Sequence, residues 1–385
     1  MWEMGTAPLA GIKVVEFCQV AAGPFCGMLL ADMGADVVKI EPPQGDSMRQ
    51  WPPLTNGFSE NFASLNRNKR SVVLDLKDAG ERNRAKQLSL TSDVVIENNR
   101  PGVMERLGLG HDRLLREKPQ LVYCSISAFG QSGPRAGEGG FDLTIQALSG
   151  IMSVTGENGG MPVKCGVPVS DFCSGLYAAF TVASMILKAR QSGIGGYADI
   201  SMQAASIAIG ALQSSQYFGT GENPQKLGAA HPRNAPYTAY EASDGYFVVA
   251  AGNDKLWRGF CEALGRPDLL LDPRFGSTSD RARHQLALGE LLRNDFKQMT
   301  VDKVLEALTN ADVPCGRINN YEQALADPQI QHLNLVRSIH LPGGGRTETF
   351  GSPIRINGIT APIVRAPPAL GQHNDEILAE CELSR

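Results

Sequence analysis

The stretch IKVVEFCQVAAGPFCGMLLADMGADVVKIE, residues 12–41, decides the fold class. Two short apolar runs, residues 12–17 and 35–41, flank a segment that begins with Gly-Pro and is followed by Gly34. Proline near the first helical position and glycine beyond the last one are typical helix boundaries. The stretch therefore predicts a strand-helix-strand unit of a parallel sheet.

The same alternation of apolar runs and helical segments continues through the first half of the chain. We expect further strands at residues 71–76, 93–98, 121–127 and 197–202, and helices at residues 78–90, 103–107, 171–188 and 204–213. Strands that alternate with helices are typical of an α/β fold with helices on both faces of the sheet. The first half is thus predicted to form a large, Rossmann-like, doubly wound domain, residues 1–225.

The pattern changes after a turn-rich polar stretch at residues 214–237, which we interpret as a linker. Residues 237–252 predict a hairpin around Asp244-Gly245, and helical periodicity follows at residues 254–264, 282–298 and 301–311. These elements predict a smaller α+β domain, residues 226–330. The segment 331–385, with its acidic C-terminal helix, is expected to return to the large domain.

Composition and charge disfavour several classes of protein. The formal net charge is -4 with both signs dispersed, so no basic face for nucleic acid is indicated. The eight cysteines contain no C-x-x-C pair, and the six histidines show no i, i+4 pair, so neither disulfides nor a metal is expected. With no signal-peptide pattern and no uninterrupted apolar run of membrane-spanning length, we expect a cytoplasmic protein that does not insert into a membrane.

Two motif searches narrow the chemistry. The turn after the first predicted strand, QVAAGPFCG, lies where a doubly wound sheet binds ligands, but it lacks the G-x-G-x-x-G spacing of an NAD-dependent dehydrogenase. GQSGP at residues 130–134 lacks the spacing of a hydrolase serine. By contrast, the basic cluster at residues 66–71 and the loop ENNRPG with Arg100 and Arg106 could grip one polyanionic ligand.

Asp171, in VPVSDFCSGLYAAF, lies where an extended apolar segment becomes a small-residue helix. Aspartate at such a junction is a common N-cap, because its carboxylate accepts hydrogen bonds from the first helical amides. A carboxylate there can also act as a nucleophile. These local features leave both interpretations open.

Seven motifs in order resemble the class III CoA-transferases, the CaiB/BaiF family. They are PLAGIKVVEF, AGPFCGMLLADMGADVVKIE, NRNKRSVVLDLK, DVVIENNRPGVMERLGLG, GFDLTIQALSG, GVPVSDFCSGLYAAF and GNDKLWRGFCEALGRPDL. The resemblance extends from about residue 8 to about residue 375. It implies a Rossmann-like lobe and a small lobe in each subunit of a homodimer of two interlocked rings. The segments near 205–235 and 325–355 would then link the lobes.

The same resemblance implies a reaction and its residues. Asp171 would attack an acyl-CoA thioester, and CoA would pass through an aspartyl-CoA thioester to an acceptor acid. No permanently bound cofactor is implied; CoA enters as part of the acyl-CoA substrate, and the acceptor is a small carboxylic acid such as a dicarboxylate, paired with Lys164 or Arg233. The CoA contacts of the family fall on Val20, Leu74, Lys77, Asn98, Asn99 and Arg106.

Departures from the family pattern bear on the substrate. Ala21 replaces a glutamine of formyl-CoA transferase, which argues against formate or oxalate as the substrate. Pro42 replaces an arginine of that enzyme, so part of the CoA contact is expected to differ. That enzyme's glycine loop is replaced by LGAAHPRNAPY, whose His231 and Arg233 could shape the acceptor pocket. Phe141 replaces the histidine base of α-methylacyl-CoA racemase and cannot move a proton from an α-carbon, which argues against the racemase-like alternative. The alternative from a different class is a non-catalytic CoA-binding protein.

Overall fold

The computed structural model describes residues 7–383, which form two compact units. Unit 1 comprises residues 7–151, 164–215 and 328–383, and unit 2 comprises residues 152–163 and 216–327. The assignment of residues 152–163 to unit 2 has no signal in the sequence, because MSVTGENGGMPV shows neither helical nor strand periodicity. The predicted domain boundaries after residues 225 and 330 stay predictions.

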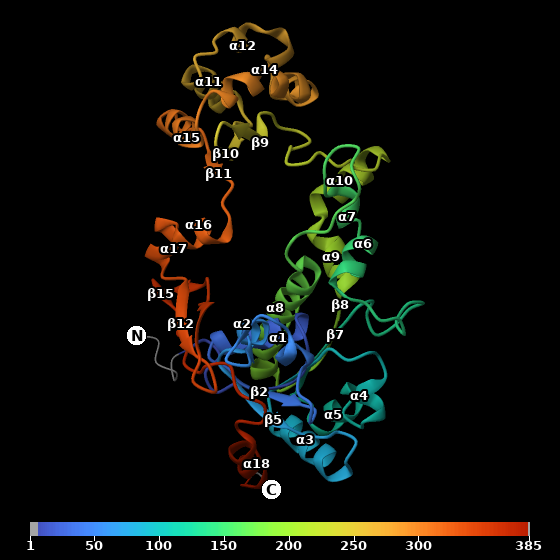
Figure 1. The fold of residues 1–385 in the computed structure, drawn as a ribbon. Helices are drawn as coiled ribbons and strands as arrows, with labels where there is room; N and C mark the ends of the chain where they lie inside the picture. The colour runs from blue at the N-terminus through green and yellow to red at the C-terminus, as the bar shows by residue number, and fades with distance from the viewer. Residues whose placement is uncertain (1–6, 384–385) are drawn as a thin grey trace. The chain divides into compact units, whose positions relative to one another are not determined.

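Unit 1 is built around a six-stranded sheet in which every neighbouring pair is parallel (Figure 1). The strand order is β5-β2-β1-β6-β7-β8. The strands are β1 Lys13–Phe17, β2 Asp36–Glu41, β5 Lys69–Val73, β6 Val94–Glu97, β7 Val122–Ser127 and β8 Gly196–Ser201. The order reverses between β1 and β6, which is where an open α/β sheet of the Rossmann type binds its ligand. The predicted α/β fold with a central parallel sheet is confirmed.

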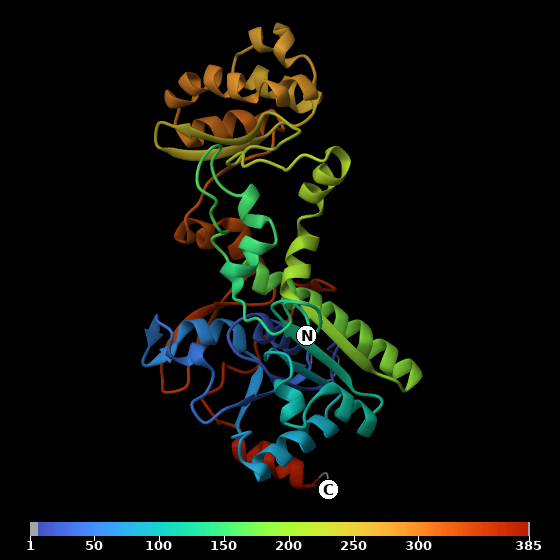
Figure 2. The ribbon, with the colours of Figure 1, turned by 90° about the vertical axis from the view of Figure 1, so that its right-hand side faces the viewer.

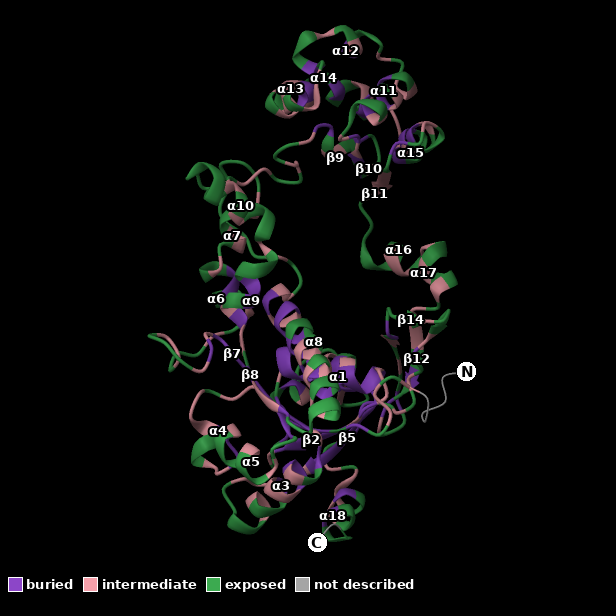
Figure 3. Cartoon of the chain, turned by 180° about the vertical axis from the view of Figure 1, so that it is seen from behind, coloured by how far each residue is buried: buried purple, intermediate pink, exposed green. Residues whose placement is uncertain are grey.

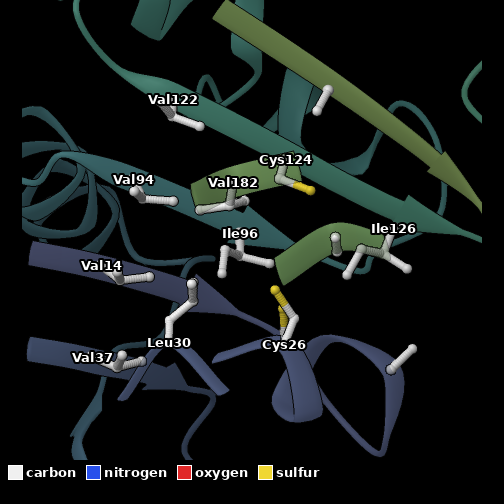
Figure 4. Close-up of a cluster of buried hydrophobic side chains, with 14 of the residues drawn as sticks. Val14, Cys26, Leu30, Val37, Val94, Ile96, Val122, Cys124, Ile126 and Val182 are labelled. Carbon is white, nitrogen blue, oxygen red and sulfur yellow. The ribbon is translucent and has the colours of Figure 1, made fainter. Parts of the chain in front are cut away.

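Helices cover both faces of this sheet, so its inner strands β1, β6 and β7 are buried on both sides (Figures 1 and 3). The helices concerned are α1 Ala22–Asp32, α3 Ala79–Thr91, α5 His111–Glu117, α8 Val169–Ser192 and α18 Asn374–Leu383. Successive side chains of a strand alternate between two cores: Val14 packs with α1 and α8, whereas Val15 packs with α3, α5 and α18. Figure 4 shows the first core, where Cys26 and Leu30 of α1 and Val182 of α8 face the sheet.

The helix boundaries follow local chemistry. Asp78 caps α3 by accepting the N–H of Glu81, and Gly193, with φ 71°, ends α8 in the left-handed conformation that glycine tolerates. The C-terminal helix α18 packs on α3 and β5. There Arg70 forms ion pairs with Glu376 and Glu380. The acidic C-terminal helix expected from the sequence therefore lies against the sheet of unit 1.

Helix α8 is the one described helix that is long and apolar enough to cross a membrane by length and composition. Core helices of soluble proteins pass the same test, and α8 packs on α1, α9 and β7 along its length (Figure 2). We therefore interpret α8 as a core helix of unit 1 that has one exposed apolar side.

Unit 2 contains a three-stranded antiparallel sheet, ordered β11-β10-β9, with helices packed on it. Its elements include β9 Tyr237–Ala242, β10 Gly245–Ala250, β11 Cys315–Arg317, α11 Asp254–Ala263, α12 Asp268–Leu271, α13 Thr278–Arg283, α14 Gln285–Lys297 and α15 Val301–Asn310. The predicted hairpin is present, with Ser243 and Asp244 at its turn, and Phe247, Phe260 and Phe296 lie in the core.

Shorter elements complete the chain. In unit 1 they include α2 Glu60–Asn66, α4 Val103–Arg106, α6 Asp142–Leu148, α9 Met202–Ile209, α17 Pro328–Leu333, and the strand pairs β3 Leu54–Thr55 with β4 Phe58–Ser59, β12 Val336–His340 with β13 Arg346–Phe350, and β14 Arg355–Ile356 with β15 Ile359–Thr360. The others are α7 Ile151–Val154, α10 Ala211–Thr220 and α16 Tyr321–Ala326. The stretch predicted to be a linker begins at Ser214, and helix α10 extends into it. Tyr217 and Phe218 belong to this helix.

Candidate active site

A pocket of about 320 Å³ lies in unit 1 at the switch point of the sheet. The loops that follow β1, β6 and β7 line it, together with the first turn of α8. Four of the site residues that the resemblance implies meet here: Val20, Asn98, Asn99 and Asp171. The structure therefore places the predicted nucleophile and three predicted CoA contacts around one cavity, where the fold favours a ligand.

Asp171 is the third residue of α8 and does not cap it, so the N-cap interpretation is wrong. Pro168 occupies the cap position, and the carboxylate of Asp142, from α6, accepts the N–H of Ser170 at 2.9 Å. Because Asp142 serves the helix terminus, the Asp171 side chain is left free to face the pocket. Gly175, one turn further along, lets α8 approach α1: a Cβ there would lie 2.8 Å from the carbonyl oxygen of Ala22.

Burial raises the pKa of Asp171 to about 7, and the neighbouring charge of Asp142 adds to the shift. The positive end of the α8 dipole favours the ionised form of Asp171 and therefore opposes this shift. No described residue donates a hydrogen bond to the Asp171 carboxylate, so burial outweighs the helix dipole. A carboxylate of raised pKa is more basic, and such groups cluster at catalytic sites.

We expect the kcat/KM for acyl-CoA to rise with pH, with an apparent pKa near 7, because only the ionised Asp171 attacks a thioester. Replacing Asp142 with asparagine keeps an oxygen for the Ser170 amide but removes the charge. Asp142→Asn should therefore lower the apparent pKa while burial keeps it above the ordinary aspartate value. Steady-state rates from about pH 5 to pH 9 test this, and a flat profile in the wild type contradicts it.

The two asparagines hold the turn between β1 and α1. Asn98 accepts the N–H of Gln19 at 2.9 Å and donates to the carbonyl oxygen of Gln19 at 2.8 Å. Asn99 donates to the carbonyl oxygen of Phe17 at 3.2 Å. The predicted CoA contacts Asn98 and Asn99 thus line the pocket, yet their amide groups also fix the backbone of the facing turn.

The other predicted CoA contacts do not line this pocket. All three follow β5 or β6 at the carboxyl edge of the sheet: Leu74 is buried in the core with α3, whereas Lys77 and Arg106 are exposed. A contact from Leu74 would therefore have to use its main chain. Lys77 and Arg106 form no ion pair with another described residue, so both charges are free for a ligand that extends along this edge.

Two pocket residues lie outside the set of CoA contacts that the resemblance implies. Arg100 lines the pocket, and its guanidinium lies close to Gly139, where a Cβ would be 2.8 Å from Nη2. The guanidinium of Arg100 makes no hydrogen bond or ion pair with another described residue. Ser127 also lines the pocket, and its buried Oγ has no partner within residues 7–383. The sequence signals were available: Arg100 lies in ENNRPG, and Ser127 ends a predicted strand.

Phe141 precedes α6, lines the same pocket and is 74% exposed. A phenyl ring cannot move a proton, so it offers no general base for α-proton exchange. The pocket therefore combines the carboxylate of Asp171 with no histidine in its lining, which favours acyl transfer over racemisation.

The fold and the pocket together define an α/β protein of the Rossmann type with a carboxylate suited to covalent catalysis. The sequence model described as CoA-transferase family III matches residues 9–374. Succinate–glutarate CoA-transferase of Agrobacterium fabrum is 36% identical over 383 residues, covering 97% of this chain and 96% of that protein. Acetyl-CoA:oxalate CoA-transferase of Acetobacter aceti is 35% identical over 357 residues, covering 92% of this chain and 90% of that protein.

A solved structure agrees with these sequence relatives. The crystal structure of a CaiB/BaiF family protein from Brucella suis has a TM-score of 0.87 to this chain, with 36% identity, and covers 97% of this chain and 99% of that one. The chain therefore belongs to CoA-transferase family III, and it is a CoA-transferase. The resemblance inferred from the seven motifs is confirmed, and the dehydrogenase alternative is set aside.

Proposed function

We propose that this enzyme moves CoA from an acyl-CoA to a small dicarboxylic acid, with Asp171 as the covalent nucleophile. The observation that carries the proposal is the position of Asp171: a carboxylate with a pKa of about 7 lies in the same pocket as Val20, Asn98 and Asn99, at the switch point of the sheet. The carboxylate needs no metal or bound cofactor to react with a thioester.

The reaction proceeds in four acyl-transfer steps, each of which breaks one bond to a carbonyl carbon and forms another. The Asp171 carboxylate attacks the donor thioester, which expels CoA as a thiolate and forms a mixed anhydride between Asp171 and the donor acyl group. The thiolate then attacks the aspartyl carbonyl, which releases the donor acid and leaves an aspartyl-CoA thioester. The acceptor carboxylate attacks this thioester to form a second anhydride and free thiolate. Finally the thiolate attacks the acceptor carbonyl, which gives the new acyl-CoA and regenerates Asp171.

The pocket suits such intermediates for two reasons. Anhydrides hydrolyse readily, so a nucleophile shielded by burial protects them from water. In addition, the burial that raises the pKa of Asp171 makes its carboxylate more basic than an exposed aspartate. A non-catalytic CoA-binding protein has no use for a partly buried carboxylate without a partner, because such a group reduces stability.

Arg100 is expected to bind the charged part of CoA, because it is the lining arginine and has no partner among residues 7–383. Arg100→Ala should raise the Kd for CoA about tenfold or more, since a charge-assisted bond to phosphate is lost. Arg100→Lys should recover part of this affinity. Arg113→Ala is a matched control, because Arg113 already pairs with Glu117 and neither residue lines the pocket. Calorimetric titration with CoA measures all three, and equal affinity of Arg100→Ala and wild type contradicts the assignment.

The acid substrate is proposed from the relatives and from two cations that the sequence analysis named. The Agrobacterium relative is named for succinate and glutarate, and the Acetobacter relative for oxalate, so identity near 35% does not choose among acids. We favour succinate or glutarate, because Ala21 replaces the glutamine found in formyl-CoA transferase. Lys164 and Arg233 are the candidates for pairing with the distal carboxylate.

A transfer assay tests this function directly. Succinyl-CoA is the donor, and glutarate, succinate, oxalate, formate and a monocarboxylate of matched length are the acceptors. We expect the highest kcat/KM with the four- and five-carbon diacids, and free CoA should not accumulate. Activity with none of the acids, or release of CoA without a new thioester, overturns the proposal.

We also propose that the enzyme is a homodimer, as the resemblance implies. The exposed side of α8 carries Leu176, Phe180 and Leu187, which are 53%, 73% and 60% exposed and share one helical face. An exposed apolar face of this kind is typical of an interface. Light scattering should show a dimer for the wild type, and Phe180→Asp should weaken it. Leu271→Asp is the control, because Leu271 is 86% exposed and belongs to unit 2.

A further inference from the structure

The turn between β1 and α1 contains an unusual backbone conformation. Six described non-glycine residues have positive φ, and Val20, with φ 66°, is the one that is neither asparagine nor aspartate. A β-branched side chain in the left-handed region is strained, so its surroundings must impose the conformation. Val20 lines the pocket that contains Asp171. The strain therefore lies in a wall of the active site.

The carboxylate of Asp46 binds the backbone of Val20. Both of its carboxylate oxygens lie 3.2 Å from the backbone nitrogen of Val20, which donates to them. Asp46 is buried, and it also accepts the N–H of Met48 at 3.0 Å, while its own N–H donates to Glu41. Asp46 is not part of the pocket lining. Its effect on a ligand would therefore be indirect, through Val20.

Lys39 binds both Asp46 and the backbone of the turn. Its ammonium lies 3.0 Å from Asp46 Oδ2 and donates to the carbonyl oxygen of Cys18 at 2.6 Å. Both side chains of this ion pair are fully buried. One buried pair thus fixes the backbone at Cys18 and at Val20, two residues apart. From the loop after β6, Asn98 binds the backbone of Gln19, which lies between Cys18 and Val20. Asn99 binds the backbone of Phe17, which precedes Cys18.

We propose that Asp46, supported by Lys39, is a positioning residue of the active site: it keeps Val20 in the left-handed conformation and thereby keeps the β1–α1 turn shaped for acyl-CoA. The proposal rests on the proposed function only in naming acyl-CoA as the ligand. If the carboxylate is removed, Val20 has no reason to remain strained, and the turn relaxes. A glycine at position 20 would hold the same conformation without help.

A double-mutant cycle separates this role from ordinary stabilisation. The variants are Asp46→Ala, Val20→Gly and the pair, all in an Asp171→Ala background, so that CoA affinity is measured without turnover. We expect Asp46→Ala to raise the Kd for CoA about tenfold when Val20 is present, but less than about threefold when Gly is at position 20. An equal loss in both backgrounds, or no loss in either, overturns the proposal.

Two further variants keep the result interpretable. If Asp46→Ala does not fold, Asp46→Asn retains an oxygen for the Val20 amide and removes only the charge; its smaller loss of affinity should likewise disappear with Gly at position 20. Asp32→Ala is the control, because Asp32 forms a buried ion pair with Arg67 and contributes nothing to the pocket lining. Its effect on affinity should not depend on the residue at position 20.

A stability cycle tests the same claim without CoA. Val20→Gly relieves strain only while Asp46 maintains it, so it should shift the urea midpoint less favourably in the Asp46→Ala background than in the wild type. Equal shifts contradict the proposal. If the wild type does not bind CoA at all, the proposed function fails, and this second cycle still decides whether Asp46 imposes the conformation of Val20.

Discussion

Asp171→Ala is expected to lose at least about 10⁴-fold in kcat, because removal of a covalent nucleophile removes the pathway that depends on it. Wild-type enzyme incubated with succinyl-CoA should carry a covalent adduct, and intact-protein mass spectrometry should show that hydroxylamine removes it. Hydroxylamine cleaves both acyl anhydrides and thioesters, so either aspartyl intermediate gives this result. Asp171→Ala should show no adduct with any donor.

The control for this variant is that it remains folded and still binds CoA. Asp171→Asn provides a second check, because it keeps the shape of the side chain. The pKa of Asp171 is raised to about 7 in the folded state, so the ionised carboxylate destabilises the fold above the unfolded-state pKa. Asp171→Asn should therefore be more stable than the wild type by about 2–4 kcal/mol at pH 8, with the gain shrinking toward pH 4.

Other outcomes lead to different conclusions. If Asp171→Ala retains transfer, the nucleophile is another group and the assignment is wrong. If the wild type binds CoA but forms no adduct and transfers nothing to any acid, a binding protein becomes the better description of the site. A stability gain in Asp171→Asn without loss of transfer would show that the buried carboxylate is a structural feature only.

The central fold could be predicted because each buried strand is a short apolar run with a recognisable boundary. Residues 12–17, 93–98 and 121–127 predicted β1, β6 and β7 to within a few residues, since both faces of a parallel sheet are buried and need apolar side chains. The insertion of residues 152–163 into unit 2 could not be predicted. Its contacts are made by turn residues, which have no periodicity.

The site was predicted less completely, for reasons that lie in tertiary structure. Asp171 and the asparagines carry family motifs, but the sequence does not show that Asp142, 29 positions earlier, accepts the Ser170 amide and so frees Asp171 from capping. Nor does local sequence show the burial that raises the pKa of Asp171. Arg100 was noticed as a nearby charge, whereas its free guanidinium at the pocket is a fact of the folded chain.

Gly27→Ala should produce a large loss of stability from one added methyl group. Gly27 lies in the middle of α1, and a Cβ there would overlap Oε2 of Glu16, which is fully buried on β1. Lys69 Nζ lies 3.4 Å from the same Cβ position and pairs with Glu16 at 2.9 Å. Relief would require moving a buried ion pair or the helix, so we expect a loss of about 3 kcal/mol or more in the free energy of unfolding.

Urea denaturation of the full-length protein measures this loss, and Gly137→Ala is the matched control. Gly137 lies in the same unit, has no left-handed φ, and a Cβ there meets no atom within 4 Å, so its replacement should change stability by less than about 0.5 kcal/mol. A Gly27→Ala loss no larger than that of Gly137→Ala would mean that Glu16 can move within the core.

The same close packing explains why an effect on CoA binding should accompany the loss of stability. Gly27 lets α1 lie directly on the charged core formed by Glu16, Lys39 and Lys69. The first turn of α1 supplies Ala21 and Ala22 to the pocket. A shift of α1 by about the size of a methyl group would move this wall of the pocket relative to Asp171. Gly27→Ala should therefore weaken CoA binding even at temperatures where the variant is fully folded, whereas Gly137→Ala should leave the affinity unchanged.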